Sequence, residues 1–300
     1  MNNENLLNEK HEKDLNYKRD MRSPFSEFVG KFKKQKTAIA ASVFILTLII
    51  LSLIGNKVVP YDYSEYDYAN VLQGPSGDHF FGTDEFGRDI FSRIIIGTKI
   101  SLFVGLLSVT IGAVAGTALG LISGYYGGFL DSIIMRISDV LFAFPGVILA
   151  IGIIAILGPG IGNVIIAVAI FSTPSFARIV RSTTLELKES VFVKAAKNLG
   201  ASDARILFKH ILPGAMSNII VYYTMTIGSS ILTASSLSFL GMGAQAPSPE
   251  WGLMLSTGRA YIGLNWHMTF FPGLAIFLTV LSFNLLGDGL RDALDPKLTE

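Results

Sequence analysis

The sequence predicts an all-α integral membrane protein with six transmembrane helices. Half of its 300 residues are hydrophobic and only 16% are charged, and the mean hydropathy is +0.51. These values are typical of membrane proteins rather than soluble domains. A helix that crosses a bilayer needs about 20 mainly apolar residues, and several segments of this chain meet that requirement.

Six apolar segments follow one another along the chain. Their expected places are 37–56, 100–130, two within 140–177, 211–249 and 261–287. The run 140–177 contains no charged residue and is too long for one helix that crosses the membrane. We expect it to be divided where Gly158, Pro159, Gly160 and Gly162 interrupt the helical pattern.

The charges between the apolar segments alternate in sign. Lysines crowd the front of the first segment, acidic residues dominate 57–97, and basic residues dominate 178–210. Because Lys and Arg favour cytoplasmic loops, we expect both termini in the cytoplasm. The predicted organisation is a cytoplasmic tail at 1–36, the first helix at 37–56, an extracellular or periplasmic segment at 57–97, a five-helix core at 98–290 that includes a cytoplasmic loop at 190–213, and a cytoplasmic tail at 291–300.

The polar residues before the first apolar segment do not have the form of a secretory signal. About 36 of them precede it, far more than a signal peptide has before its apolar core, and no cleavage site of small residues is evident after Gly55. We expect the first helix to stay in the mature protein as an anchor.

Several classes of function are disfavoured by residues that the sequence lacks. It has no cysteine, so it can form neither a disulfide nor a thiolate metal site, and its four histidines show no metal-ligand spacing. A net charge of +1 gives no excess of positive charge of the kind that binds nucleic acids. The phosphate-binding pattern GxxxxGK followed by Ser or Thr is absent. We therefore expect no enzyme, no directly bound metal or cofactor, and no nucleic-acid partner.

The segment KAAKNLGASDARILFKHILP at 194–213 is a polar island between apolar segments. Gly200 is suited to a hinge or to the C-terminal cap of a first short helix. Ser202 or Asp203 can cap a second short helix, and Pro213 marks its limit or a kink at the next membrane helix. An amphipathic helix across the membrane face suits docking into a groove of a soluble partner. In this interpretation Ile206, Leu207 and Phe208 are apolar anchors, and Arg205 and Lys209 set the orientation.

The same segment resembles the EAA loop of ABC importer permeases, since it carries Ala195, Ala196, Gly200, Leu212 and Pro213 at the spacing of that motif. Lys194 stands where the family usually has Glu, so no salt bridge of that Glu is carried over. The resemblance implies a coupling helix that contacts an ATPase subunit. The residues assigned to this contact are Lys194, Ala195, Ala196, Gly200, Ala201, Ser202, Asp203, Arg205, Ile206, Leu207, Phe208, Leu212 and Pro213.

Four further segments, in the expected order, resemble the C-type permease of dipeptide and oligopeptide ABC importers. They are FGTDEFGRDIFSR (81–93), SDVLFAFPGVILA (138–150), SLSFLGMGAQAPSPEWGLML (236–255) and FNLLGDGLRDALDPK (283–297). Within that branch the chain looks closest to permeases of dipeptide and glutathione importers, and nickel importers use similar permeases. The resemblance implies a multi-pass protein of the bacterial cell (inner) membrane.

The resemblance also implies the partners. They are a homologous second permease, two ATPase subunits that use ATP and Mg²⁺, and an extracellular or periplasmic solute-binding protein. It names no residue that lines the substrate pathway. The main alternative is a secondary transporter, because six helices could form half of an inverted repeat. Against it, the membrane segments lack the central ionisable residues that ion coupling needs. A scaffold or channel subunit is a third possibility.

Some local interpretations stay open at this point. The glycines at 112, 116, 120 and 124 favour a close-packed seam inside the subunit over a contact with another subunit or with the pathway. We expect Arg136 to pair with Asp139 on one helix face, and Thr83 or Asp84 to cap the helix after the outer loop. Trp251 is either an interfacial anchor or part of a docking or gating segment.

Overall fold

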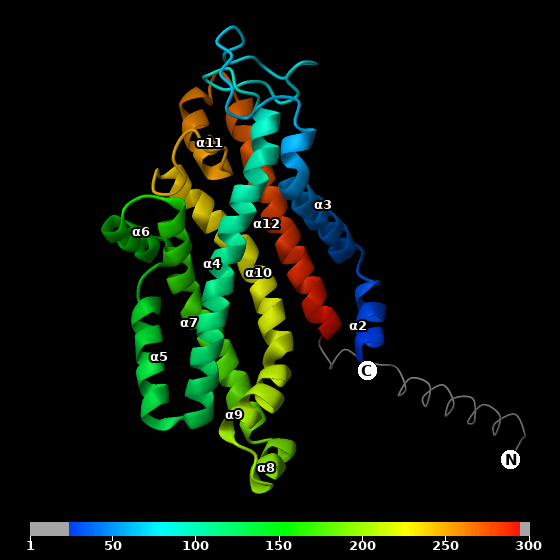
Figure 1. Ribbon diagram of the computed structural model, residues 1–300, viewed down its shortest axis with the longest axis vertical. Coiled ribbons are helices and arrows are strands. Elements are labelled where there is room, and N and C mark those ends of the chain that lie inside the picture. Colours follow the sequence, from blue (N-terminus) through cyan, green and yellow to red (C-terminus); the bar gives the residue numbers. More distant parts are fainter. Residues whose placement is uncertain (1–23, 295–300) are drawn as a thin grey trace, which may run out of the picture.

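The computed structural model describes residues 24–294, and helices joined by loops make up this part of the chain (Figure 1). It contains one isolated β-bridge, Thr83 to Asp89, and no strand. The all-helical prediction is therefore confirmed. The helices are α2 (Pro24–Phe32), α3 (Lys36–Val58), α4 (Ile90–Tyr126), α5 (Gly128–Phe142), α6 (Gly146–Leu157), α7 (Ile161–Lys188), α8 (Val191–Asn198), α9 (Asp203–Ile206), α10 (Leu212–Phe239), α11 (Trp251–Gly258) and α12 (His267–Leu294), with a π-helical turn η1 (Leu207–Ile211) and a 3-10 turn η2 (Arg259–Tyr261).

Four of these helices are each long and apolar enough to cross a membrane: α3, α4, α7 and α12. Helices α5 and α6, bent by 93° to one another, make a fifth crossing if the pair is one span. Helix α10 has 28 residues and no charge, and it packs against α4, α7 and α12. It is the remaining segment of the six that the sequence predicts.

One predicted boundary is wrong. The second helix begins at Ile90, about ten residues before the predicted segment, and its 37 residues span about 55 Å at 1.5 Å per residue. The third begins at Gly128, ahead of Asp131, Arg136 and Asp139, and it ends before Pro145, because proline disfavours the helical conformation of the residue before it. The predicted break at 158–160 is present between α6 and α7.

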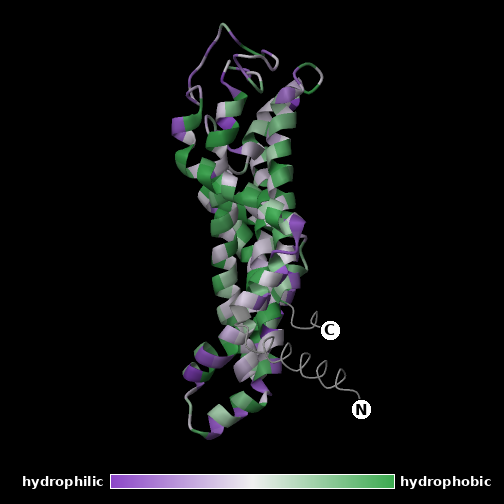
Figure 2. Ribbon diagram, turned by 90° about the vertical axis from the view of Figure 1, so that its right-hand side faces the viewer, coloured by the Kyte–Doolittle hydropathy of each residue, from purple (hydrophilic) through white to green (hydrophobic). Residues whose placement is uncertain are grey.

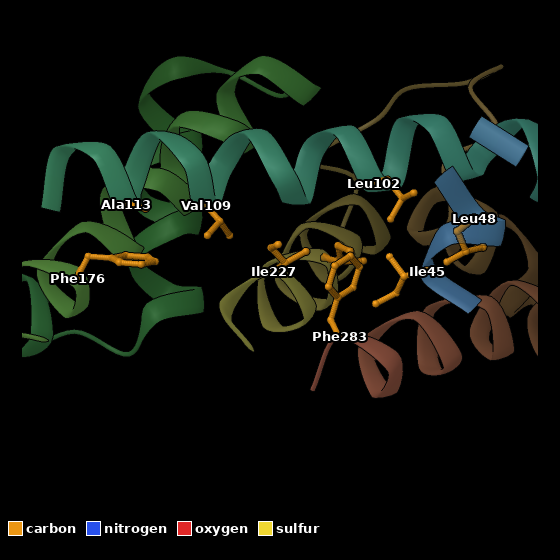
Figure 3. Packing of buried hydrophobic residues seen from close by; sticks show 9 residues of the cluster. Ile45, Leu48, Leu102, Val109, Ala113, Phe176, Ile227 and Phe283 are labelled. Atoms are coloured by element: carbon orange, nitrogen blue, oxygen red, sulfur yellow. The ribbon is translucent and has the colours of Figure 1, made fainter. Parts of the chain in front are cut away.

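The hydrophobic core lies where α3, α4, α7, α10 and α12 meet. Figure 3 shows side chains from these five helices directed toward one another between the ribbons. The buried members include Ile45 of α3, Val109 of α4, Phe176 of α7, Ile227 of α10 and Phe283 of α12. Figure 2 shows the apolar residues along the length of this bundle and hydrophilic residues at its two ends. This distribution fits a bundle that crosses a bilayer.

Helices α4 and α7 make the most extensive contact in the described chain. The four glycines of α4 face α7 so closely that an added Cβ at Gly116 would lie 2.5 Å from the Cβ of Phe176 and 3.0 Å from the backbone nitrogen of Ala177. Gly120 and Gly124 meet the backbone and side chains of α7 in the same way. The seam inside the subunit, which the sequence favours, is confirmed.

The loop 59–89 is irregular but held in place. The buried Arg88 donates to Asp84 at 2.7 Å, and His79 lies 3.0 Å from Asp89. Asp89 also caps α4, since its side chain accepts from the backbone nitrogen of Ser92. The prediction of Thr83 or Asp84 as the cap is therefore wrong: Asp84 is engaged by arginine instead, and Thr83 bonds within the loop.

The loop 59–89 is fastened to the far end of the chain. The ring of Phe81 stacks on that of Phe271 at 4.0 Å, and Asn265 donates to the carbonyl of Leu72 at 2.7 Å. In Figure 1 this loop lies at one end of the bundle, above α3, α4 and α11. The arrangement gives that end of the bundle a fixed cap.

The charges of α5 pair with α7 rather than with each other. Asp131 accepts from Arg181 at 2.5 Å, and Asp139 from Arg178 at 2.5 Å. Arg136 is exposed and has no ion-pair partner among residues 24–294, so its predicted pairing with Asp139 is wrong. An ion pair between helices neutralises both charges beside the apolar region.

Parts of the predicted tails lie outside the described residues. These are residues 1–23 of the predicted tail 1–36 and residues 295–300 of the predicted tail 291–300. Within the described part, helix α2 lies inside the first predicted tail, and Gln35 next to it donates to Asp292 of α12 at 2.8 Å.

Candidate functional site

The segment 189–213 lies at the end of the bundle opposite the loop 59–89 (Figure 1). The chain leaves α7 at Lys188, forms the separate helix α8, turns, and returns through α9 and η1 into α10. Helix α8 therefore protrudes from the bundle with its two ends tied to long membrane helices. The chain on either side of α8 is continuous with α7 and, through α9 and η1, with α10.

The turn between α8 and α9 depends on Gly200. Its φ is +84°, in the left-handed region that favours glycine. The backbone nitrogen of Gly200 donates to the carbonyl of Lys197, and that of Ala201 donates to the carbonyl of Ala196. This pair of hydrogen bonds is a Schellman motif, which satisfies the last carbonyls of a helix. Of the two roles that the sequence left open, Gly200 is the cap.

The second half of the segment begins with a cap and a hydrogen bond to α4. The side chain of Ser202 accepts from the backbone nitrogen of Arg205. Asp203 accepts from the hydroxyl of Tyr125 at 2.6 Å, and Lys188 donates to the carbonyl of Tyr125 at 2.6 Å. The last turn of α4 therefore holds both the entrance and the exit of the protruding segment.

Apolar residues of the segment also fix it to the bundle. Ile206, with no exposed surface, and the nearly buried Leu207 pack in a cluster with Leu121 of α4 and Val180 of α7. Val193 of α8 belongs to the same cluster. The interpretation of Ile206 and Leu207 as anchors for a partner is therefore wrong, because their side chains are buried inside this subunit.

The apolar surface that is free to meet a partner lies on α8 and the turn after it. Val191 is 85% exposed and Leu199 is 88% exposed, with Phe192 and Ala195 exposed on the same short helix. Positions 191, 195 and 199 follow a four-residue spacing, so they share one face. Phe208 is the one predicted anchor that points outward. Sequence reasoning did not single out Val191, Phe192 and Leu199, although their spacing before and after the alanines is readable.

The other predicted residues differ in their exposure. Lys194, Ala195, Arg205, Lys209 and Pro213 are exposed. Ala196, Ala201 and Leu212 are partly buried. The structure thus brings the predicted residues into one protruding unit but divides them between its outer face and its attachment to the bundle.

The position where the EAA pattern carries Glu has a different electrostatic role here. Lys194 donates to Glu189 at 2.8 Å, and this hydrogen bond lowers the pKa of Glu189 below its usual value. Both side chains are well exposed, so the pair adds little to stability. The ring of His210 lies 6.3 Å from that of Phe192.

The return into α10 has no break. The backbone nitrogen of Leu212 donates to the carbonyl of Leu207, five residues earlier, which is the wider turn of a π-helix. Pro213 lies in the first turn of α10, where its missing amide hydrogen costs least. The sequence predicts a limit or a kink at Pro213, and the structure has a π-helical turn directly before it. The elements α9, η1 and α10 therefore follow one another without a break.

Of the two roles that the sequence suggested for Trp251, the interfacial anchor is wrong, and a part in a docking or gating segment stays a prediction. It has no exposed surface, and its indole nitrogen donates to the carbonyl of Ile94 in α4 at 3.0 Å. It packs with Ile90, Met254 and Met268. Trp251 therefore joins α11 to α4 and α12 inside the bundle.

No group of three or more His, Asp or Glu residues that could hold a metal ion occurs within residues 24–294.

Comparison with known proteins gives the family. Residues 116–300 match the family described as the inner membrane component of binding-protein-dependent transport systems. The chain belongs to this family. Residues 23–75 in addition match the N-terminal transmembrane domain of oligopeptide transport permease C. The protruding segment 189–213 lies within the first match.

Two relatives are similar to this permease over nearly their whole length. The glutathione transport system permease protein GsiD of Pectobacterium atrosepticum is 56% identical over 93% of both chains. GsiD of Escherichia coli is 57% identical over 93% of this chain and 92% of its own.

Solved structures show the same fold at lower identity. The MetNI methionine ABC transporter, in an inward-facing conformation, aligns with a TM-score of 0.56 and 21% identity over 68% of this permease and 97% of that chain. An amino acid ABC transporter aligns with a TM-score of 0.53 and 18% identity over 67% of this permease and 94% of its own chain. At these identities the likeness concerns the fold alone.

Proposed function

We propose that this permease is one of two membrane subunits of an ATP-driven importer for small peptides, with glutathione as the first candidate ligand. The observation that carries this proposal is the 56–57% identity to permeases named for glutathione transport, over 93% of the chain. The match of 23–75 to oligopeptide permease C supports a peptide. Longer peptides, dipeptides and nickel are the alternatives to be tested.

The importer that we propose has further subunits. A homologous second permease forms the translocation pathway together with this one. Two ATPase subunits bind ATP and Mg²⁺ at the α8 end of the bundle, and a solute-binding protein delivers the ligand at the loop 59–89. In this arrangement α8 and both termini lie in the cytoplasm of a bacterium. The basic residues at 178–210 and the acidic residues at 57–97 support this orientation.

Helix α8 supplies the coupling in this proposal. Its exposed face of Val191, Ala195 and Leu199 seats in a groove of the ATPase subunit, as amphipathic helices commonly bind partners. The buried Ile206 and the Tyr125–Asp203 hydrogen bond make α8 and the bundle move together. ATP shifts the equilibrium between inward- and outward-facing states only through its different affinity for the two.

Reconstitution in lipid vesicles tests the function. The permease is purified with its partner permease, ATPase subunits and binding protein, and uptake of labelled glutathione, a dipeptide and Ni²⁺ is measured with and without ATP. We expect uptake of glutathione that requires both ATP and the binding protein. Uptake driven by a proton or sodium gradient without the ATPase subunits would replace this proposal with a secondary transporter.

A pair of matched substitutions tests the coupling surface. Leu199 and Leu264 are 88% and 87% exposed, but Leu199 follows α8, whereas Leu264 precedes Asn265, which is bonded to Leu72 of the loop 59–89. We expect Leu199→Asp to abolish retention of the ATPase subunits during purification, because a carboxylate cannot enter an apolar groove without a partner. Leu264→Asp should retain them. Equal retention in both variants would show that α8 is not the docking helix.

A further inference from the structure

The bundle also contains an open cleft between α6, α7 and α10, which is separate from the coupling segment 189–213. Its volume is about 360 Å³, which lies in the range of small-molecule sites. Helix α6 contributes Gly146 and Val147 to its wall, and α7 contributes Val168 and Phe171. The rest of the lining carries hydroxyl groups: Ser172 and Ser175 of α7, and Tyr222, Thr226, Ser229, Ser230 and Thr233 of α10.

The hydroxyl residues of α10 form one face of the helix. Thr226, Ser229 and Thr233 each donate to a backbone carbonyl of the preceding turn, at 2.7, 2.9 and 2.9 Å. Such bonds use the hydroxyl hydrogen and leave the oxygen lone pairs available as acceptors. The hydroxyls of Ser175 and Tyr222 hydrogen-bond no other residue of the described chain. They therefore need water or a solute in the cleft, because a polar group in an apolar environment without a partner is costly.

A second groove on the same subunit gives the contrast. It lies between α4, η1 and α10, has a volume of about 690 Å³, and is lined mainly by apolar residues such as Val114, Ile122 and Met216. Lipid or an apolar helix satisfies that lining fully. The hydroxyl-lined cleft lies near the middle of α7 and α10, at the depth where polar groups are least favourable toward lipid. Two hollows at one subunit surface thus differ in the chemistry that they accept.

We propose that the cleft between α6, α7 and α10 is this subunit's share of the passage, and that it accepts a polar, peptide-sized solute through neutral hydrogen bonds. The inference rests on the proposed function. None of the lining residues is charged. A fixed charge would hold an oppositely charged group of a peptide too strongly, whereas conduction needs binding that is weak and distributed. A wall of hydroxyl groups can donate to carboxylates and accept from ammonium and amide groups of many peptides.

The absence of cysteine from the sequence permits a direct test. Ser175→Cys and Ser229→Cys are placed one at a time in the chain, and the assembled transporter in vesicles is treated with a charged, membrane-impermeant maleimide. Ile170→Cys is the matched control, since Ile170 lies on α7 at nearly the same depth, is 38% exposed and is not part of the cleft. Gly77→Cys in the loop 59–89 is the exposed positive control.

We expect loss of the free thiol in Ser175→Cys, Ser229→Cys and Gly77→Cys, and none in Ile170→Cys. Modification of the two cleft variants should also abolish uptake. The inference is overturned if both cleft variants resist the reagent as Ile170→Cys does, or if they react while uptake continues unchanged. The thiol assay needs no transport, so labelling of the cleft in a transporter without ATP-driven uptake would refute the proposed function and leave the passage in place.

Discussion

The hydroxyl of Tyr125, in the last turn of α4, donates to the carboxylate of Asp203 at 2.6 Å. Asp203 opens α9, directly after the turn that follows α8. One hydrogen bond therefore joins the helix at the centre of the bundle to the segment that we propose to couple transport to ATP. Its neighbour Tyr126 is exposed and makes no such bond within the described chain.

This contact predicts a difference between two adjacent substitutions. Tyr125→Phe should lower the stability of the purified transporter by about 1 kcal/mol, because a hydrogen bond to a carboxylate is lost. It should also weaken the stimulation of ATP hydrolysis by substrate. Tyr126→Phe is the control and should change neither quantity. Equal effects of the two variants, measured by thermal unfolding and ATPase activity, would argue against the link.

The seam between α4 and α7 predicts sensitivity to a single methyl group. Gly116→Ala should destabilise the bundle by about 1–3 kcal/mol, because its Cβ overlaps the backbone and Cβ of α7. Gly152→Ala in α6 is the control: no atom lies within 4 Å of the added Cβ, so the substitution should be neutral or slightly stabilising. Thermal unfolding in detergent measures both. A stable Gly116→Ala variant would mean that α4 and α7 lie farther apart.

At Gly200 the backbone conformation, and not steric crowding, should decide which substitutions are tolerated. No atom lies within 4 Å of a Cβ added there, so the cost of a substitution comes from its φ of +84°. Gly200→Pro should destroy the cap, at more than about 1 kcal/mol, since proline fixes φ near −65°. ATP-dependent uptake should be lost while membrane insertion is normal. Gly200→Asn is the control and should retain uptake, because Asn tolerates this conformation. Normal uptake by Gly200→Pro would separate the cap from coupling.

Glu85 in the loop 59–89 predicts that the stability of the protein depends on pH. Burial raises the pKa of this carboxyl above its usual value. One of its oxygens has no partner in the described chain, and the other lies 3.5 Å from Arg88. A raised pKa in the folded state means that the folded protein binds the proton more tightly than the unfolded chain. Stability is therefore lost as pH rises from the unfolded pKa through the folded pKa.

Glu85→Gln should accordingly stabilise the loop at neutral pH and have no effect at a pH below the unfolded pKa of the carboxyl. Thermal unfolding of both proteins across pH measures the difference, and Glu65→Gln, an exposed acid of the same loop, is the control. If Glu85→Gln is less stable than the natural protein at neutral pH, the attraction of Arg88 outweighs the burial.

Local chemistry made parts of the fold predictable. A long apolar run predicts a membrane helix whatever surrounds it, which placed α3 and α12. A left-handed turn accepts few residues besides glycine, which marked the cap at Gly200. Glycines at every fourth position on one helix can serve only close approach to another surface, and this indicated the seam that α7 fills.

Which side chains face the inside of the bundle and which face outward could be decided only from the tertiary structure. In a membrane protein apolar residues point both inward and outward, so hydrophobicity alone did not show that Ile206 and Leu207 are buried while Val191 and Leu199 are exposed. The same ambiguity allowed Trp251 to be interpreted as an interfacial anchor, although its side chain is buried. The sequence did not show the partners of the charged residues either, because Asp131 and Asp139 pair with residues of a helix about 40–50 positions away.

The sequence by itself thus determined the class of the protein, its long apolar helices in outline and the turn that defines the protruding segment, since these follow from short-range constraints on each stretch of chain. Only the tertiary structure decided which face of α8 is free, that Tyr125 holds Asp203, and that hydroxyls of α7 and α10 meet in one cleft. The physical reason is that these features arise from pairs of distant segments, and the distance between two such segments is set by the packing of the whole bundle.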